Sequence, residues 1–293
     1  MSEVIKIGNS IENDLRKSMQ ADCRNCFGLC CTALNIVASS DFAIHKPAGT
    51  PCPNLQSNFS CQIHRELRNK GFKGCTVYDC LGAGQWVSQS TFRGQDWRNN
   101  SEIANKMFRI FPIMEQLYEM IAFVAEAMSY AISQRLYDKL HEQLENLQHL
   151  TKLNVEALLA IDISHIRLPV NTLLLETSEL IRNELVINTF SKQNGRKTNY
   201  RGANWMGKNL KGKDLRATDL RGALLIATNL QQADLRGVDF IGADLRDANV
   251  CGANLSTAMF LTQMQINSAV GNHETKLPFY LSMPTHWHNS IQK

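Results

Sequence analysis

A large apolar residue returns at every fifth position between residues 200 and 260, without a break in register. The residue before it is mostly Asp or Asn, and the one two positions before it is mostly Ala or Thr. A period of five fits neither an amphipathic helix nor an alternating strand. It predicts a solenoid in which stacked turns bury one another's apolar residues. These residues are Tyr200, Trp205, Leu210, Leu215, Leu220, Leu225, Leu230, Leu235, Phe240, Leu245, Val250, Leu255 and Phe260.

This repeat resembles the pentapeptide-repeat family. The resemblance implies a right-handed quadrilateral β-helix over residues 196–262, with four five-residue sides in each turn. Glycine recurs two positions after the large residue, where a corner needs unusual backbone angles. We expect residues 263–293 to form a C-terminal cap with a short helix near 262–267, because the end of a solenoid exposes backbone groups and apolar rungs. Trp287 is predicted to plug that end.

The predicted fold class is mixed, because helical patterns precede the repeat. We expect a helix within residues 1–20 and a helical region over 101–192. Apolar residues at steps of three and four from Met114 onward predict a packed helix, and a second helix is expected from Leu136 to about Leu159. Pro169 is expected to end that block, with another helix over 171–190. The apolar face from Met114 onward packs against another helix of the same chain, or it pairs two copies of the chain. The second arrangement would be a homodimer through the helical region.

The composition and charge are those of an ordinary globular chain, with a formal net charge of +4. The N-terminus lacks the apolar stretch of a signal peptide, and no apolar run has the length of a membrane span. The sequence therefore predicts a cytoplasmic protein with no membrane partner. In a reducing compartment, clustered cysteines favour metal binding or catalysis over disulfides.

Eight of the nine cysteines fall between residues 23 and 80 and begin with a C-x2-C pair, which is typical of zinc and iron–sulfur sites. This region, residues 21–97, is rich in Gly and Pro, so we expect short elements and a metal that adds stability. The segment CRNCFGLCC and the later GCTVYDC resemble a bacterial Cys-rich family of zinc- or iron-chelating domains, with one extra residue before the adjacent pair. The candidate ligands are Cys23, Cys26, Cys30, Cys31, Cys52, Cys61, Cys75 and Cys80.

The sequence leaves the metal open between an iron–sulfur cluster and zinc, with free or redox-paired thiols as the alternative. The thiols are enough for one centre plus structural cysteines, or for two separate tetrahedral ions. One of the adjacent pair Cys30 and Cys31 ligates while the other packs, or both ligate. His64 is interpreted as structural or solvated, and Cys251 as facing outward from the coil.

The predicted function is a protein-interaction scaffold, with an unidentified protein partner, that carries a metal or redox sensor. The first alternative is an enzyme with a redox-active iron–sulfur head, since the Cys-rich motif also resembles that of bacterial protein lysine methylases. The second is a DNA-mimicking inhibitor or protector of a topoisomerase. Residues 196–260 carry ten Lys or Arg against six Asp, so they make a poor copy of DNA. No aromatic residues interleave with these charges as in single-strand binders, and this argues against nucleic acid as a partner.

Overall fold

The computed structural model describes residues 10–190 and 198–289, and the side chains of residues 14–187 and 198–287. The chain forms two compact units, each assembled from separate stretches of sequence. The coil unit comprises residues 1–17, 126–138 and 172–293, and the thiol unit comprises 18–125 and 139–171. Residues 1–9, 191–197 and 290–293 lie outside the described residues, and they include parts of the predicted regions 1–20, 101–192, 196–262 and 263–293. No helix in the described ranges is both long and apolar enough to cross a bilayer.

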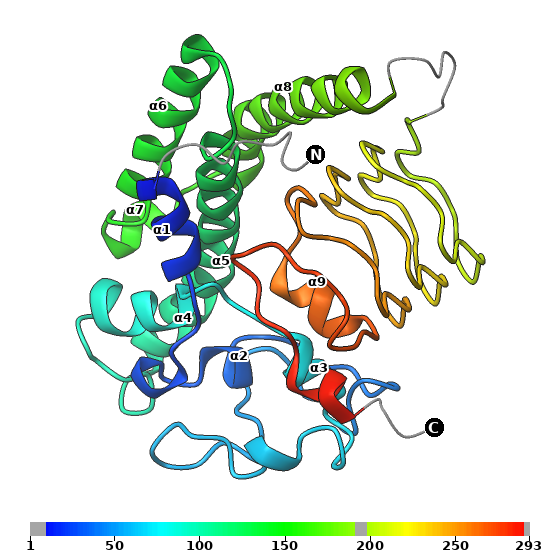
Figure 1. Cartoon of the computed structure of the whole chain (residues 1–293). Coiled ribbons are helices and arrows are strands. Elements are labelled where there is room, and N and C mark those ends of the chain that lie inside the picture. The colour runs from blue at the N-terminus through cyan, green and yellow to red at the C-terminus, as the bar shows by residue number, and fades with distance from the viewer. Residues whose placement is uncertain (1–9, 191–197, 290–293) are drawn as a thin grey trace. The chain divides into compact units, whose positions relative to one another are not determined.

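Helices occupy both units, and the coil follows the last long helix (Figure 1). The α-helices are α1 Ser10–Ser18, α2 Leu29–Thr32, α3 Lys73–Val77, α4 Ala83–Trp86, α5 Ser101–Met128, α6 Gln134–Leu150, α7 Val155–Leu159, α8 Ile163–Phe190 and α9 Gln263–Ser268. Shorter 3-10 turns are η1 Cys23–Asn25, η2 His64–Glu66 and η4 Thr285–Asn289, and η3 Val87–Thr91 is a π-helical turn.

Two predicted helix boundaries are wrong. Pro169 does not end a helix, because α8 continues through it and buries Val170 and Leu174 beyond it. A proline removes one backbone hydrogen bond, and we attribute the continuation to this apolar packing. The predicted helix from Leu136 to about Leu159 is instead two helices. It breaks after α6, and Asn154 starts α7 by accepting a hydrogen bond from the Ala157 N–H.

The repeat folds into a coil in which every fifth residue, from Asn199 to Asp239, pairs with the residue twenty positions later, as in Asn204 with Leu224 and Leu224 with Asp244. These parallel pairings are isolated bridges, and the described part of the coil contains no continuous strand, because each side turns after five residues. The predicted large residues from Leu220 to Leu255 lie in one buried core with their Ala neighbours. Tyr200, Leu210 and Leu215 in the first turn are only partly buried.

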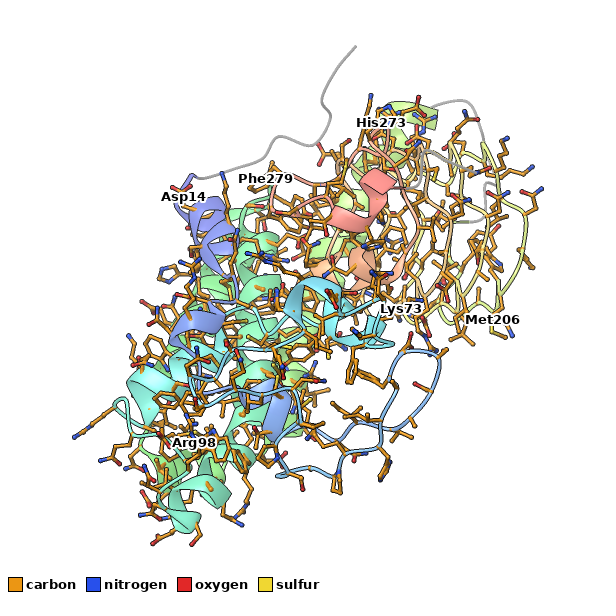
Figure 2. The ribbon with its side chains drawn as sticks, turned by 90° about the horizontal axis from the view of Figure 1, so that it is seen from below. Asp14, Lys73, Arg98, Met206, His273 and Phe279 are labelled. Carbon is orange, nitrogen blue, oxygen red and sulfur yellow. The ribbon has the colours of Figure 1, made fainter. Side chains whose placement is uncertain are left out.

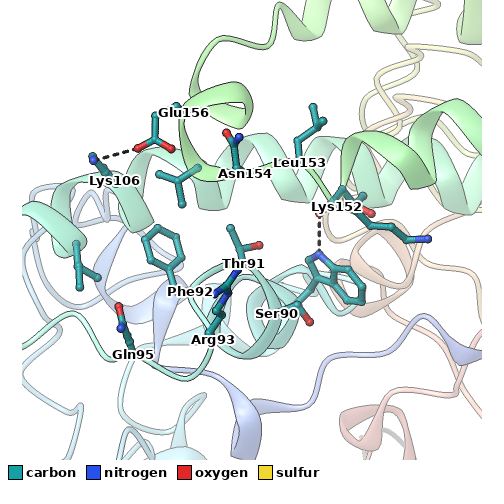
Figure 3. A pocket seen from close by; sticks show the side chains of 14 residues that line it. Ser90, Thr91, Phe92, Arg93, Gln95, Lys106, Lys152, Leu153, Asn154 and Glu156 are labelled. Carbon is teal, nitrogen blue, oxygen red and sulfur yellow. Dashed lines mark hydrogen bonds and ion pairs between the residues drawn. The ribbon is translucent and has the colours of Figure 1, made fainter.

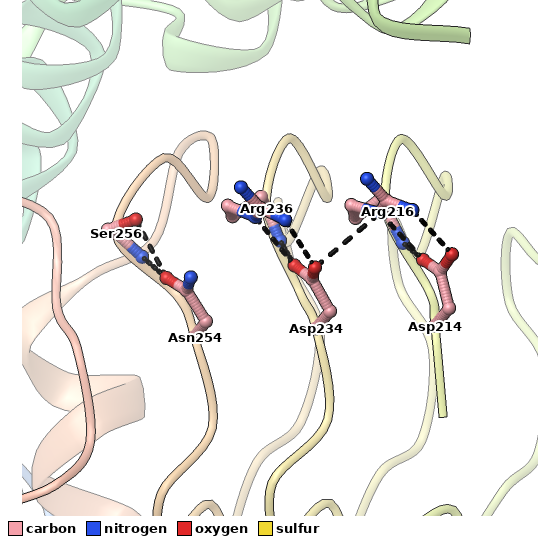
Figure 4. A network of polar contacts seen from close by, with 6 residues as sticks. All are labelled: Asp214, Arg216, Asp234, Arg236, Asn254 and Ser256. Atoms are coloured by element: carbon pink, nitrogen blue, oxygen red, sulfur yellow. Dashed lines mark hydrogen bonds and ion pairs between the residues drawn. The ribbon is translucent and has the colours of Figure 1, made fainter. Parts of the chain in front are cut away.

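The turns between the sides of the coil explain why Asp or Asn recurs before most of the large apolar residues. The side-chain oxygen of Asn204 accepts the backbone N–H of Met206, and the same bond recurs from Asn199 to Asn254. Such a bond stabilises a turn within three residues. Along one side, Asp214 pairs with Arg216 at 2.8 Å and Asp234 with Arg236 at 2.6 Å, while Arg216 also reaches Asp234 at 3.5 Å (Figure 4).

The segment after the repeat packs on the coil. Helix α9 begins with a capping box between Thr262 and Gln265, and Gln265 also donates to the carbonyls of Phe240 and Ala243 in the coil. Trp287 is fully buried in the coil core and donates its indole N–H to the Ala269 carbonyl at 3.0 Å. The plug prediction for Trp287 is therefore confirmed. By contrast, Met206 lies on the outer surface of the coil and is 49% exposed (Figure 2).

Phe260 departs from the predicted register. It is buried but packs edge-on against Tyr130, and Leu261 occupies the core position instead. The backbone N–H of Phe260 donates to Oε1 of Glu126 at 2.6 Å, and the Tyr130 hydroxyl donates to the same oxygen at 2.7 Å. Burial raises the pKa of Glu126 to about 7, although the nearby Arg16 acts in the opposite direction.

Leu225 and its neighbour Leu224 provide a matched test of the coil. Leu225 is fully buried and Leu224 is 38% exposed. We expect Leu225→Ala to lower the free energy of unfolding by about 2 to 5 kcal/mol, because it leaves a cavity in the core. Leu224→Ala should change it by about 0.5 kcal/mol. Urea unfolding followed by tryptophan fluorescence measures both, and equal losses would contradict the inward register.

Glu126 predicts a pH dependence of stability. Between its ordinary pKa near 4.5 and the raised value of about 7, the folded state binds more protons than the unfolded state. The unfolding free energy should therefore fall as pH rises through this window, by about 3 kcal/mol in all from this residue. Glu126→Gln keeps the accepting oxygen and removes the titration. Urea midpoints at pH 5 and 8 should show a smaller decline in the variant, and identical declines would contradict the assignment.

Candidate thiol site

The thiol unit has its own apolar core beneath the cysteine-bearing loops. Leu29, Ala83 and Val87 are fully buried. An aromatic row runs from Phe27 to Phe59 (ring centroids 5.1 Å apart), on to Trp97 (6.0 Å) and then to Phe108 (5.4 Å). The Trp97 indole donates to the Phe27 carbonyl at 2.8 Å, which fixes the row to the loop after Cys26. The loops that carry the cysteines therefore rest on packed side chains.

Cys26 and Cys80 occupy matched turns. Each is followed two positions later by a left-handed glycine, Gly28 with φ 65° and Gly82 with φ 101°, and a short helix begins at the next residue. The backbone N–H groups of Gly28 and Leu29 lie against the Cys26 sulfur, and those of Gly82 and Gly84 against the Cys80 sulfur. Burial raises the pKa of both thiols, and these N–H groups oppose it by favouring the thiolate.

Gly84 brings these two turns together. A Cβ placed on Gly84 would lie 2.9 Å from the Cys26 sulfur and 3.6 Å from the Cys80 sulfur. A side chain there would displace the sulfurs, so the absence of one lets both thiols approach the same point. Cys23 stands on η1 nearby in sequence, is exposed, and interacts electrostatically with Cys26 and with Cys80.

A second set of thiols gathers around the loop at 47–61. The Cys52 N–H donates to the Cys31 carbonyl at 2.9 Å, and Cys61 forms an antiparallel bridge with Leu55 that closes the loop. Cys75, on α3, interacts electrostatically with Cys31, Cys52 and Cys61. Burial raises the pKa of Cys75 to about 12, with these neighbouring thiols adding to the effect.

The adjacent cysteines of α2 lie between the two sets, with their sulfurs 3.9 Å apart. The hydrogen bond from Cys30 lowers the pKa of Cys31, and the nearby ammonium group of Lys46 acts in the same direction. The same contact raises the pKa of Cys30. Of the two thiols, Cys31 is therefore the one that ionises more readily.

The donor set suits a thiophilic metal. All nine cysteines, which lie within the described ranges, are free thiols, and the space beside Gly84 is open to two of them. No three Cys, His, Asp or Glu side chains in the described part of the chain stand close enough together to hold an ion. The ligand assignment of the eight clustered cysteines stays a prediction. His64 is exposed on η2, and Cys251 belongs to the coil unit.

Lys46 is a buried residue of this site that the sequence did not reveal. Its side chain is 2% exposed, and its ammonium group donates to the carbonyls of Thr32 (3.1 Å), Leu34 (2.6 Å), Pro47 (3.1 Å) and Thr50 (2.9 Å). Burial lowers the pKa of Lys46, and the thiols of Cys52, Cys31 and Cys30 act in the opposite direction. Lys46 thus ties the loops before and after it and places a positive charge beside the thiols.

A separate open pocket of about 670 Å³ lies elsewhere in the thiol unit (Figure 3). Trp86 forms one wall and donates its indole N–H to the Thr151 carbonyl at 2.9 Å. Lys106 pairs with Glu156 across the rim at 3.3 Å, and Arg93 holds a left-handed backbone with φ 52°. The lining comes from two distant stretches, 86–106 and 151–156, which explains why no local motif predicted it.

Comparisons with known proteins agree with the repeat. A family model described as pentapeptide repeats matches residues 218–256 in eight copies. The chain is 53% identical to a Bacillus subtilis (strain 168) protein described as "Uncharacterized protein YybG", over 98% of this chain and 100% of that protein.

Two solved structures match part of the chain. Rfr23, a pentapeptide repeat protein from the cyanobacterium Cyanothece 51142, is 28% identical over 27% of this chain and 53% of its own, with a TM-score of 0.25. HetL, a pentapeptide repeat protein involved in heterocyst differentiation regulation from Nostoc sp. strain PCC 7120, is 28% identical over 29% of this chain and 37% of its own, with a TM-score of 0.21. The chain therefore spans about half, or less, of the length of these two structures.

Lys46→Met should destabilise the thiol unit, because it leaves four carbonyls without their buried donor. We expect a loss of about 3 kcal/mol in the free energy of unfolding. Lys70→Met is the control, since Lys70 is exposed and pairs only loosely with Glu66 at 3.7 Å, and its effect should stay below about 0.5 kcal/mol. Urea unfolding measures the stability of both variants. An unchanged midpoint for Lys46→Met would contradict the stabilising role of Lys46.

Proposed function

Because this chain is a pentapeptide-repeat protein and belongs to the family of Bacillus subtilis YybG, we propose that it is a protein-interaction scaffold whose thiol unit binds a thiophilic metal. The metal is zinc or an iron–sulfur cluster, held by cysteines among the eight between residues 23 and 80. Its occupancy reports metal supply or oxidising conditions to a partner protein. We place this activity in the cytoplasm, where thiols stay reduced.

The observation that carries the metal proposal is the pair of matched Cys-x-Gly turns around Gly84. Burial raises the pKa of the Cys26 and Cys80 thiols, and the backbone N–H groups at their sulfurs oppose this by favouring the thiolate, which is the form that binds a metal. The Lys46 ammonium group supplies further positive charge beside Cys31 and Cys52. These features compensate the negative charge that several thiolates would bring together.

The scaffold part of the proposal is supported by the outer surface of the coil. Met206 and Leu224 are exposed apolar residues on adjacent turns, and Leu224 replaces the Asp or Asn found at most other corners. Exposed apolar side chains that lie together are typical of protein-binding surfaces. The homodimer through residues 101–192 stays a prediction, and Leu168 on α8 is an exposed apolar residue of that region.

Of the two alternatives, the DNA mimic is the less well supported. Arginines recur along the coil, and the pairs in Figure 4 alternate positive and negative charge, unlike the continuous negative charge of DNA. The enzyme alternative would require a substrate site, for which the pocket beside Trp86 is one cavity among the described residues. We favour the scaffold because its evidence includes the repeat itself.

The metal content of the protein tests the proposal directly. The full chain, purified without oxygen, should contain zinc, or iron with matching sulfide, in stoichiometric amounts. Bound iron–sulfur clusters would also give broad brown visible absorbance. Cys26→Ser combined with Cys80→Ser should lower the metal content by at least half, while Cys251→Ser should leave it unchanged, because Cys251 lies in the coil unit.

The proposal fails if the purified chain contains no metal and takes up neither Zn²⁺ nor Co²⁺ when stripped and titrated. The sensor role has its own readout. Binding of a partner, once one is identified, should differ between the metal-loaded and stripped chains by tenfold or more, and equal binding would leave a scaffold without a sensor.

A further inference from the structure

We infer that the pocket beside Trp86 binds a small organic anion that carries an apolar or aromatic ring. This inference is independent of the proposed scaffold and metal roles, because the described residues that line the pocket include no cysteine. The pocket volume of about 670 Å³ lies within the range of about 300 to 1,000 Å³ that is usual for small-molecule sites.

The walls of the pocket are joined by two side-chain contacts. The Trp86 indole N–H donates to the Thr151 carbonyl at 2.9 Å, and the Lys106 ammonium group pairs with Glu156 at 3.3 Å. Both contacts connect the stretch at 86–106 with the stretch at 151–156. The cavity is therefore formed before a ligand enters, which lowers the entropy cost of binding.

The apolar part of the lining suits a ring. The only polar atom of the Trp86 side chain already bonds to Thr151, so the remainder of that side chain is apolar ring surface. Aromatic and aliphatic side chains favour contact with a ring that leaves water. The apolar side chains of the lining are Trp86, Phe92, Ile103, Leu153 and Val155.

The polar part of the lining carries surplus positive charge. Lys106 is already paired with Glu102 at 2.8 Å and with Glu156 at 3.3 Å. Arg93 and Lys152 also line the pocket, and neither forms an ion pair within the described part of the chain. Two cations without a carboxylate partner favour an anion, and a guanidinium group can bind a carboxylate or a phosphate through two parallel hydrogen bonds.

The wall that carries Arg93 has an unusual backbone (Figure 3). The π-helical turn η3 ends at Thr91, and Arg93 follows in the left-handed region with φ 52°. That conformation costs a residue other than glycine about 1 to 2 kcal/mol. Both features are frequent at functional sites. The Thr91 hydroxyl oxygen is buried and makes no hydrogen bond to any described residue, which makes it a further candidate to bond a ligand.

Two fluorescent probes that differ only in charge test the inference on the full chain. Anilinonaphthalene sulfonate carries an anionic group on its aromatic rings, and phenylnaphthylamine has the same rings without the sulfonate. We expect the sulfonate probe to bind saturably and about tenfold more tightly than the neutral probe. An absence of saturable binding, or equal affinities for the two probes, would overturn the inference.

Substitution of the two cations locates the binding site. Arg93→Gln and Lys152→Gln should each weaken binding of the sulfonate probe by about fivefold, and together they should abolish the preference for the charged probe. Lys70→Gln is the matched control, because Lys70 is an exposed cation of the same unit that does not line the pocket. Arg93 and Lys152 are exposed, so the urea midpoints of the variants should stay unchanged. Unchanged binding by the folded double variant would overturn the inference.

Competition on the unsubstituted chain requires no variant and identifies the charged group. Benzoate and phenyl phosphate each combine a ring with an anionic group, whereas inorganic phosphate has no ring. We expect at least one of the two ring compounds to displace the sulfonate probe, and the tighter competitor assigns the ligand to the carboxylates or the phosphates. Displacement by neither ring compound, or equal displacement by inorganic phosphate, would overturn the inference.

Discussion

The coil depends on one constraint, which is that successive turns must stack so that every fifth residue from Asn199 to Asp239 pairs with the residue twenty positions later. This stacking places Leu230 in one apolar core with the large residues of the other turns, and it buries the row from Leu220 to Leu255. It also fixes the corners, where an Asp or Asn oxygen must accept the N–H two residues on. The apolar row forms the buried core, and the side-chain hydrogen bonds at the turns hold the backbone in the conformation that changes its direction.

The same constraint explains why the coil could be predicted from sequence and the helical parts only partly. A five-residue period leaves no competing register, so the inward set from Leu220 to Leu255 follows from counting. The exception is Phe260, which leaves the register because Glu126, distant in sequence, accepts its N–H. Likewise Pro169 remains within α8, next to the buried Val170. Long-range contacts such as these carry no local signal in the sequence.

The thiol site, like the helical parts, could be predicted from sequence only in part. Cysteine spacing identifies the candidate ligands, because C-x2-C is a local pattern, and it brings Cys26 and Cys80 into consideration. It does not reveal that Gly84 opens the space between them, or that Lys46 binds four carbonyls beneath the loops. Both features arise from chain segments that meet only after folding. Glycine and lysine are also common surface residues, so their types alone would not single them out.

The core of the thiol unit bears on what a metal would do there. Small zinc domains without a core are unfolded when the metal is removed. Here Leu29, Val87 and the aromatic row from Phe27 to Phe108 form an apolar core that uses no cysteine, and Lys46 ties the cysteine loops. A metal would therefore act mainly on the loops rather than on the whole unit. A centre whose loss leaves the rest of the unit folded is suited to sensing, because occupancy can change while the scaffold persists.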